Sequence, residues 1–158
     1  MIKTGIGYDV HKLEYGHKLI LGGIEIPHEK GLIGHSDADV LTHSIIDALL
    51  GAIGFGDIGD HFPDTSEDYK GIDSQILLKK TLNIIKSKKT NIINIDASII
   101  AQAPKLTNYK IEIKNNLAKT LEISPSQINI KATTEEYLGF TGEQLGIKAL
   151  AVCTIETN

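Results

Sequence analysis

The chain has 158 residues, 41% of them hydrophobic and 23% charged, and this composition predicts one globular domain over residues 1–158 with an aliphatic core. The formal net charge of −4 argues against a nucleic-acid partner, because no basic patch is available to neutralise a phosphate backbone. No apolar run approaches the roughly 20 residues of a membrane span, and the N-terminus lacks a signal-peptide layout, so we expect a cytoplasmic protein without a membrane partner.

The first half of the chain is predicted to contain a strand, a hairpin and a helix. In residues 2–13, mostly apolar side chains such as Ile6, Tyr8 and Val10 alternate with glycines and polar side chains, which indicates a strand. Residues 19–26 contain two central glycines and indicate a hairpin, and a polar loop is expected over residues 27–35. A helix should begin after Ser36, an N-cap with Asp39 at the capping-box position, and end at the glycines that follow its apolar positions.

The second half is predicted to alternate between helices and strands. The expected elements are a long loop over 55–72, a helix over about 74–87 capped by Asp73 or Ser74, a strand over 92–102, a helix over about 108–121, and strands over 128–133 and 146–155. The apolar positions of the later helix are Ile111, Ile113, Leu117 and Leu121, and Cys153 reads as a buried structural thiol. The pattern predicts an α/β sandwich whose mixed sheet is covered by helices on one face.

Asp9, His11 and His43 are candidate ligands of a divalent metal ion. Residues two apart on a strand point to the same face, so Asp9 and His11 should project side by side. One carboxylate and two imidazoles suit zinc, and three protein ligands leave a fourth position open for a substrate. The alternative is a solvated strand end near a helix histidine, although the polar run from His35 to His43 exceeds what a helix cap requires.

Three further segments have both a structural and a functional interpretation. Residues 56–65 combine glycines and carboxylates, which are typical of a turn but can also hydrogen-bond a polyol. Residues 101–105 end a strand, and they suit either a strand stop followed by a surface Lys or a site where backbone groups approach a flat ligand and Lys105 reaches a phosphate. Residues 131–142 offer hydroxyls and carboxylates for a helix cap or for phosphate and Mg²⁺.

The order of these segments resembles that of the 2-C-methyl-D-erythritol 2,4-cyclodiphosphate synthase family over essentially the whole chain. The matching motifs are Gly7-Tyr8-Asp9-Val10-His11, the run His35 to His43, Asp47 to Gly51, Gly56 to Gly59, Phe62 to Thr65, Ala101 to Lys105, Lys131 to Thr134 and Gly139 to Gly142. The resemblance implies a ferredoxin-like α+β domain that forms a homotrimer with active sites between subunits. It also implies a metal-dependent phosphorus–oxygen lyase of the non-mevalonate isoprenoid pathway. That enzyme converts 4-diphosphocytidyl-2-C-methyl-D-erythritol 2-phosphate to the cyclic 2,4-diphosphate and releases CMP.

The resemblance further implies roles for particular residues. Asp9, His11 and His43 correspond to zinc ligands, and Glu136 to the carboxylate that holds Mg²⁺ or Mn²⁺ between the substrate phosphates. His35 and Thr134 correspond to residues that stabilise the transition state. The implied substrate-binding residues are Ser36, Asp57, Ile58, Gly59, Phe62, Pro63, Asp64, Thr65 and Ser66 near the phosphates and erythritol, Ala101, Gln102, Ala103, Pro104, Lys105, Leu106 and Thr107 around the cytidine, and Thr133, Glu135 and Phe140.

Two departures from the family pattern leave questions open. A third Thr is common after Thr134 in relatives, but here Glu135 follows, so that two adjacent carboxylates compete for the second metal ion. The register of Leu138-Gly139-Phe140 favours Glu136. Glu143 stands where relatives commonly have an Arg that helps bind a prenyl diphosphate at the trimer axis, so we expect no such binding here.

Two other functions fit the same residues less well. A nucleotide phosphohydrolase would use similar metal ions but deliver water and form a linear monophosphate. A non-catalytic metal-binding trimer would need neither a second metal ion nor a nucleotide pocket, and the sequence offers candidates for both.

Overall fold

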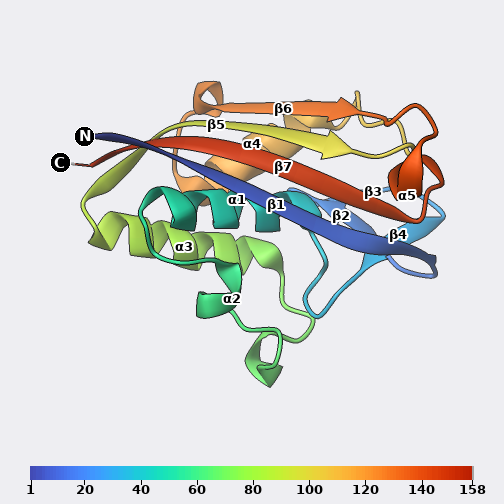
Figure 1. The fold of residues 1–158 in the computed structure, drawn as a ribbon, viewed down its shortest axis with the longest axis horizontal. Helices are drawn as coiled ribbons and strands as arrows, with labels where there is room; N and C mark the ends of the chain where they lie inside the picture. Colours follow the sequence, from blue (N-terminus) through green and yellow to red (C-terminus); the bar gives the residue numbers. More distant parts are fainter. Residues whose placement is uncertain (158) are drawn as a thin grey trace.

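The computed structural model describes residues 1–157, which form a layer of strands and a layer of helices (Figure 1). The main sheet has five strands in the order β4-β1-β7-β5-β6. Within residues 1–157, only β5 and β6 pair in parallel, so the sheet is mixed, as the sequence predicted. The strands are β1 (Ile2–Tyr15), β4 (Lys30–Ile33), β5 (Thr90–Ile100), β6 (Ile128–Thr133) and β7 (Gly146–Thr157).

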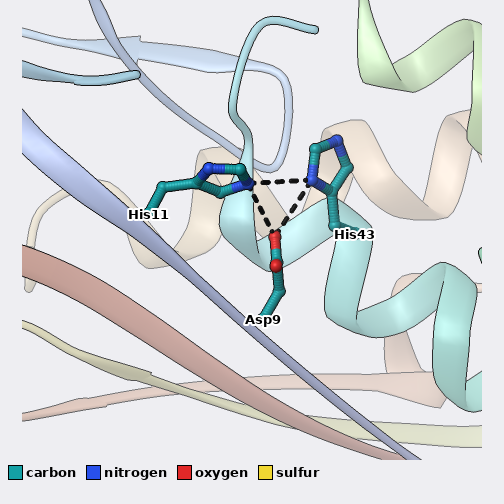
Figure 2. A group of neighbouring side chains, drawn as sticks. All are labelled: Asp9, His11 and His43. Carbon is teal, nitrogen blue, oxygen red and sulfur yellow. Dashed lines mark hydrogen bonds and ion pairs between the residues drawn. The ribbon is translucent and has the colours of Figure 1, made fainter. Parts of the chain in front are cut away.

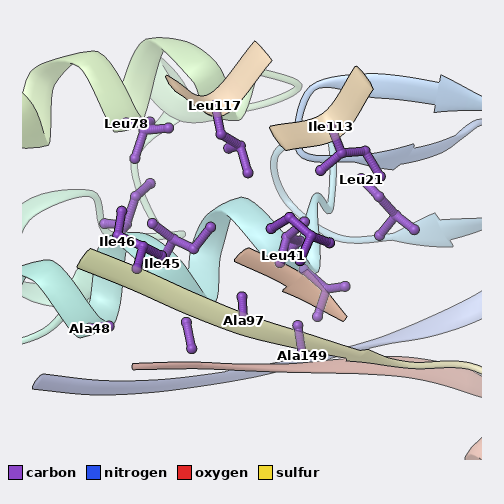
Figure 3. Packing of buried hydrophobic residues seen from close by; sticks show 14 of the residues in the cluster. Leu21, Leu41, Ile45, Ile46, Ala48, Leu78, Ala97, Ile113, Leu117 and Ala149 are labelled. Atoms are coloured by element: carbon purple, nitrogen blue, oxygen red, sulfur yellow. The ribbon is translucent and has the colours of Figure 1, made fainter. Parts of the chain in front are cut away.

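Long helices cover one face of this sheet: α1 (Val40–Ala52) lies over β1 and β7, α4 (Lys110–Leu121) packs on β6, and α3 (Ser74–Ser87) packs against both helices (Figures 1 and 3). The remaining elements are the hairpin strands β2 (Leu19–Leu21) and β3 (Ile24–Ile26), the short helices α2 (Ile58–His61) and α5 (Gly139–Gly142), and the 3₁₀ turns η1 (Glu67–Tyr69) and η2 (Pro125–Gln127). Within residues 1–157, no helix is long and apolar enough to cross a bilayer.

Helix α1 lies unusually close to β1 because β1 presents glycines to it. A Cβ on Gly7 would lie 1.9 Å from the Ser44 carbonyl oxygen, and one on Gly5 would lie 2.0 Å from that of Ala48. No side chain larger than hydrogen fits at either position. The opposite side of α1 packs against α3, and its Leu41 and Ile45 belong to an aliphatic core that also includes Ile113 and Leu117 of α4 (Figure 3). This close approach brings the first turns of α1 beside the middle of β1.

The other face of the sheet carries apolar side chains without a cover. Ile6, Tyr8 and Val10 of β1 are 65%, 53% and 40% exposed, and Leu150 and Val152 of β7 lie beside them in the strand register. The alternation in β1 therefore predicted the strand correctly, although its glycines rather than its large apolar residues face the helices. An apolar face of this kind usually marks an interaction site.

Most predicted elements are confirmed, and the errors are local. Helix α1 begins at Val40 with Asp39 as its N-cap, not after Ser36, because the Asp39 carboxylate accepts the Thr42 amide. The loop predicted over 27–35 contains β4, and the loop predicted over 55–72 contains α2 and η1. Ile111 is 73% exposed, whereas Ile113, Leu117 and Leu121 of the same helix are buried. The hairpin, α3, β6 and the buried Cys153 agree with prediction.

Candidate active site

Asp9, His11 and His43 converge as the sequence predicted (Figure 2). Asp9 and His11 project from the same face of β1, and His43 comes from the start of α1. The Asp9 Oδ2 lies 3.0 Å from His11 Nε2 and 3.0 Å from His43 Nδ1, and the two ring nitrogens are 3.4 Å apart. Ligands at about 2.0–2.1 Å from a tetrahedral zinc ion lie about 3.3 Å from one another. The donor set and its spacing therefore fit zinc.

Hydrogen bonds on the far side of each imidazole fix which nitrogen faces the site. The Nδ1 of His11 donates to the Ile33 carbonyl oxygen at 3.0 Å, which leaves its Nε2 lone pair for a metal ion. The Nε2 of His43 lies 2.7 Å from the Ser74 hydroxyl and 3.1 Å from the Ser36 hydroxyl. Metal-binding histidines commonly have such a hydrogen bond on the ring nitrogen that faces away from the metal ion.

The charges at the site favour the binding of a cation. Burial by itself would raise the pKa of Asp9, but hydrogen bonds and charge from His11 and His43 outweigh it and lower the pKa to about 2. Burial would lower the pKa of His11, yet the hydrogen bond and charge of Asp9 raise it. A negative carboxylate between two imidazoles therefore attracts either a proton or a metal ion, and the two must compete.

A cavity of about 440 Å³ opens beside these ligands. The His35 ring lies in its wall, held by an Nε2 hydrogen bond of 2.8 Å to the Ser66 carbonyl oxygen. The Ile58 amide donates to the Asp47 carboxylate at 3.1 Å, which ties the α2 segment to α1. The lining residues are Asp9, His11, His35, Ser36, His43, Ile58, Gly59, Phe62, Pro63, Asp64, Thr65, Tyr69 and Leu77.

A second cavity, also of about 440 Å³, lies at the ends of β5 and β6. It is lined by Ala101, Gln102, Pro104, Lys105, Leu106, Thr107, Ala132, Thr133 and Thr134. In the strand register, Asp9 pairs with Ala149, Ala149 with Ile99, and Ile99 with Ala132. These pairings place Asp9 and Ala132 three strand spacings apart, or about 14 Å. Within residues 1–157, the two cavities share no lining residue.

The adjacent carboxylates Glu135 and Glu136 have different surroundings. Glu135 accepts hydrogen bonds from Lys148, at 2.7 Å, and from Thr141, and the pKa of Glu135 is lowered by these contacts. Among residues 1–157, the exposed Glu136 carboxylate has no hydrogen-bond partner. The Glu136 amide donates to the Thr134 hydroxyl at 3.2 Å. Glu136 is therefore the carboxylate free to bind a second cation.

Not every predicted site residue lines a cavity. Within residues 1–157, six of them line neither cavity: Asp57, Ser66, Ala103, Glu135, Glu136 and Phe140. Asp57 instead caps α2 by accepting the Asp60 amide at 3.0 Å. Conversely, sequence reasoning missed Tyr69 and Leu77, which line the first cavity, because nothing in their local pattern distinguishes them from a loop residue and a core residue.

The fold and the site together define an α+β protein with an Asp-His-His group that could hold a metal ion, at the rim of a cavity. The chain belongs to the YgbB family, whose sequence model matches residues 2–156. It is 56% identical over 156 residues to the 2-C-methyl-D-erythritol 2,4-cyclodiphosphate synthase of Fusobacterium nucleatum, covering 99% of this chain and 98% of that relative. A protein of the same name from Clostridioides difficile is 56% identical over 154 residues, covering 98% and 96%.

Solved structures agree with this assignment. The bifunctional IspDF of Campylobacter jejuni matches all of this chain with a TM-score of 0.96 at 42% identity, and the chain spans 43% of that longer protein. The IspF of Plasmodium falciparum, solved in a complex with CDP, matches with a TM-score of 0.87 at 37% identity, covering 99% of this chain and 97% of the other. The predicted family and the mixed α+β fold are thus confirmed.

Proposed function

We propose that this protein converts 4-diphosphocytidyl-2-C-methyl-D-erythritol 2-phosphate to 2-C-methyl-D-erythritol 2,4-cyclodiphosphate and CMP, a step of non-mevalonate isoprenoid biosynthesis. The observation that supports it most is the convergence of Asp9, His11 and His43 beside a cavity, in a chain 56% identical over 156 residues to a named synthase. In this reaction an oxygen of the 2-phosphate forms a bond to the β-phosphorus. The bond from that phosphorus to the bridging oxygen breaks, and CMP leaves with the electron pair.

The main obstacle in this reaction is the approach of two anionic phosphates. Asp9, His11 and His43 would hold Zn²⁺, and Glu136 would hold Mg²⁺ or Mn²⁺. When bound, these cations neutralise phosphate charge and polarise phosphorus–oxygen bonds. A chain with a net charge of −4 has no surplus of its own cations for this task. Because the nucleophile is already an anion, the protein needs no strong general base.

His35 and Thr134 would stabilise the charge that moves onto the departing phosphate. The Ser66 carbonyl oxygen accepts from His35 Nε2 at 2.8 Å and holds the ring in the wall of the first cavity. The Thr134 hydroxyl oxygen accepts from the Glu136 amide at 3.2 Å, which leaves its O–H free to donate to a phosphate oxygen. Orientation of donors before the reaction is the main way in which a protein stabilises such a transition state.

The position of the two cavities supports an active site shared between chains. One cavity contains the zinc ligands, and the other contains Gln102, Lys105 and hydroxyl groups suited to a nucleotide. A homotrimer would join the metal cavity of one chain to the cytidine cavity of its neighbour. The exposed apolar face of β1 and β7 offers a surface for that assembly.

Incubation with the cytidyl substrate and mass analysis of the products tests the proposal. Zinc and magnesium should support release of CMP together with the cyclic diphosphate. A linear monophosphate product would instead indicate a phosphohydrolase, and no CMP release with any metal would indicate a non-catalytic protein. His11→Ala should abolish CMP release, because it removes one of three zinc ligands. Near-normal turnover of that variant would show that the ligand assignment is wrong.

A further inference from the structure

His43 makes a second set of contacts behind the metal site, through residues outside the predicted ligand set. Its Nε2 lies 2.7 Å from the hydroxyl oxygen of Ser74, the first residue of α3. The Ser74 hydroxyl in turn donates a short hydrogen bond to the Asp37 carboxylate. The other Asp37 oxygen accepts the Ser74 amide at 2.9 Å. Ser74 is fully buried and Asp37 is half-buried.

The direction of the hydrogen bonds follows from the chemistry of these groups. An ionised carboxylate only accepts, so the single Ser74 hydroxyl proton must point to Asp37. The Ser74 oxygen can then only accept from His43, which places the imidazole proton on Nε2. The Nδ1 atom of His43 keeps its lone pair, and this atom lies 3.0 Å from Asp9 Oδ2. A metal ion needs that lone pair.

We propose that Asp37 and Ser74 are positioning residues that hold His43 in the metal-binding tautomer and orientation. Asp37 acts through Ser74, and within residues 1–157 neither residue belongs to the proposed ligand set or lines the first cavity. The inference rests on the proposed zinc site and extends it to a carboxylate–hydroxyl–imidazole relay. It also joins the loop before α1 to the start of α3, since the Asp37 amide donates to the Ile72 carbonyl oxygen at 3.1 Å.

Zinc affinity, measured by competition with a chromophoric chelator on the full chain, tests the relay. Ser74→Ala should weaken zinc binding by about 10- to 100-fold, the range typical when a metal-binding histidine loses the hydrogen bond on its other ring nitrogen. It leaves the Ser74 amide bond to Asp37 and the Asp73 cap of α3 in place. Ser87→Ala, at the other end of α3, is the matched control and should change affinity less than twofold, because its hydroxyl contacts only the Ile84 carbonyl oxygen within residues 1–157.

A double-mutant comparison separates the relay from a general loss of stability. If Asp37 acts through Ser74, then Asp37→Asn combined with Ser74→Ala should bind zinc about as well as Ser74→Ala alone. Cobalt substituted for zinc should show altered visible absorption in both single variants, because the His43 ligand is less well oriented. If the losses of zinc-binding free energy in the two single variants add in the double variant, Asp37 does not act through Ser74.

Two further variants distinguish a failure of the Asp37–Ser74 relay from a failure of the zinc site. Ser36 lies 3.1 Å from the same His43 nitrogen, so Ser36→Ala should weaken zinc binding less than Ser74→Ala, and the reverse order would overturn the relay. His11→Ala should lose zinc altogether. If it does, and Ser74→Ala binds zinc within twofold of the original protein, only the relay is wrong. If His11→Ala keeps its zinc, the proposed metal site itself fails.

Discussion

At the residue scale, the pair Glu135 and Glu136 shows how surroundings separate two identical side chains. The Glu135 carboxylate is held by Lys148 and Thr141. Glu136 and Tyr137 have positive φ values of 54° and 64°, a left-handed conformation that is unfavourable for such residues. The Gln102 side chain accepts the Tyr137 amide at 3.0 Å and supports this conformation. Strained backbone of this kind is often found at functional sites, which favours Glu136 as the metal-binding carboxylate.

We predict different effects for the same change at these two positions. Glu136→Gln should lower turnover by at least about tenfold and raise the Mg²⁺ concentration needed for half-maximal activity, because a neutral amide is a poor Mg²⁺ ligand. Glu135→Gln is the matched control and should leave the Mg²⁺ requirement unchanged, because exposed ion pairs contribute little to stability. Magnesium titrations of CMP release would check both variants. A shifted Mg²⁺ requirement in Glu135→Gln alone would reverse the assignment.

Cys153 gives a prediction for alkaline pH. Burial raises the pKa of its thiol to about 11 from an ordinary value of 9.0. Above pH 9 the thiol ionises in the unfolded chain but not in the folded one, so the folded state loses stability as pH rises from 9 to 11. The loss should reach about 2–3 kcal/mol. Urea unfolding at several pH values should show this decline, and Cys153→Ala should show a shallower one. Equal slopes in the two proteins would contradict the prediction.

At the element scale, the contact between β1 and α1 determines the geometry of the metal site. The glycines of β1 let α1 approach until His43 lies beside Asp9 and His11. The β1 alternation and the α1 periodicity were both readable from the sequence. The distance between β1 and α1 could not be read from the sequence, because small residues on a strand do not specify what packs against them.

A matched pair of glycine substitutions tests this contact. Gly7→Ala should destabilise the protein by about 3 kcal/mol or more, because its methyl group would meet α1 backbone atoms that cannot move aside. Gly51→Ala, within α1 itself, should be neutral or stabilise by about 0.5–1 kcal/mol. At Gly51 the nearest atom to an added Cβ is the Ile6 carbonyl oxygen, at 3.9 Å. Urea unfolding of both variants gives the measurement, and equal effects would mean that the contact is looser than described.

The sequence predicted elements with strong local signals and missed those that depend on distant partners. The strand β4 is short, and it forms because Lys30 to Ile33 pair with the far end of β1. Asp39 rather than Ser36 caps α1 because its buried carboxylate also accepts the amides of Gly22 and Gly23 in the hairpin. The same limit applies to the site. Asp9 and His11 were found from strand periodicity, whereas Ser74 reads locally as a helix start and reaches His43 only in the fold.

At the scale of the whole molecule, one chain is an incomplete enzyme under the proposed function. Its metal cavity and its cytidine cavity are separated by the strands between β1 and β6. The sheet face opposite the helices exposes large apolar side chains on β1 and β7. Both facts have the same explanation if neighbouring chains pack on this face, because assembly would bury the apolar surface and complete the site.

Ile6→Glu tests that explanation, because Ile6 is 65% exposed in the single chain and its replacement should cost the isolated fold little. A charge buried at an interface without a partner is unfavourable, so the variant should sediment as a monomer. It should still bind zinc, since all three ligands come from one chain, but CMP release should fall at least about 100-fold because the cytidine cavity of a neighbour is missing.

Ile111→Glu, on α4 at 73% exposure, is the control and should sediment like the original protein. A monomeric Ile6→Glu with full activity would show that each chain holds a complete site, and a fully active trimer would show that this face is not the interface.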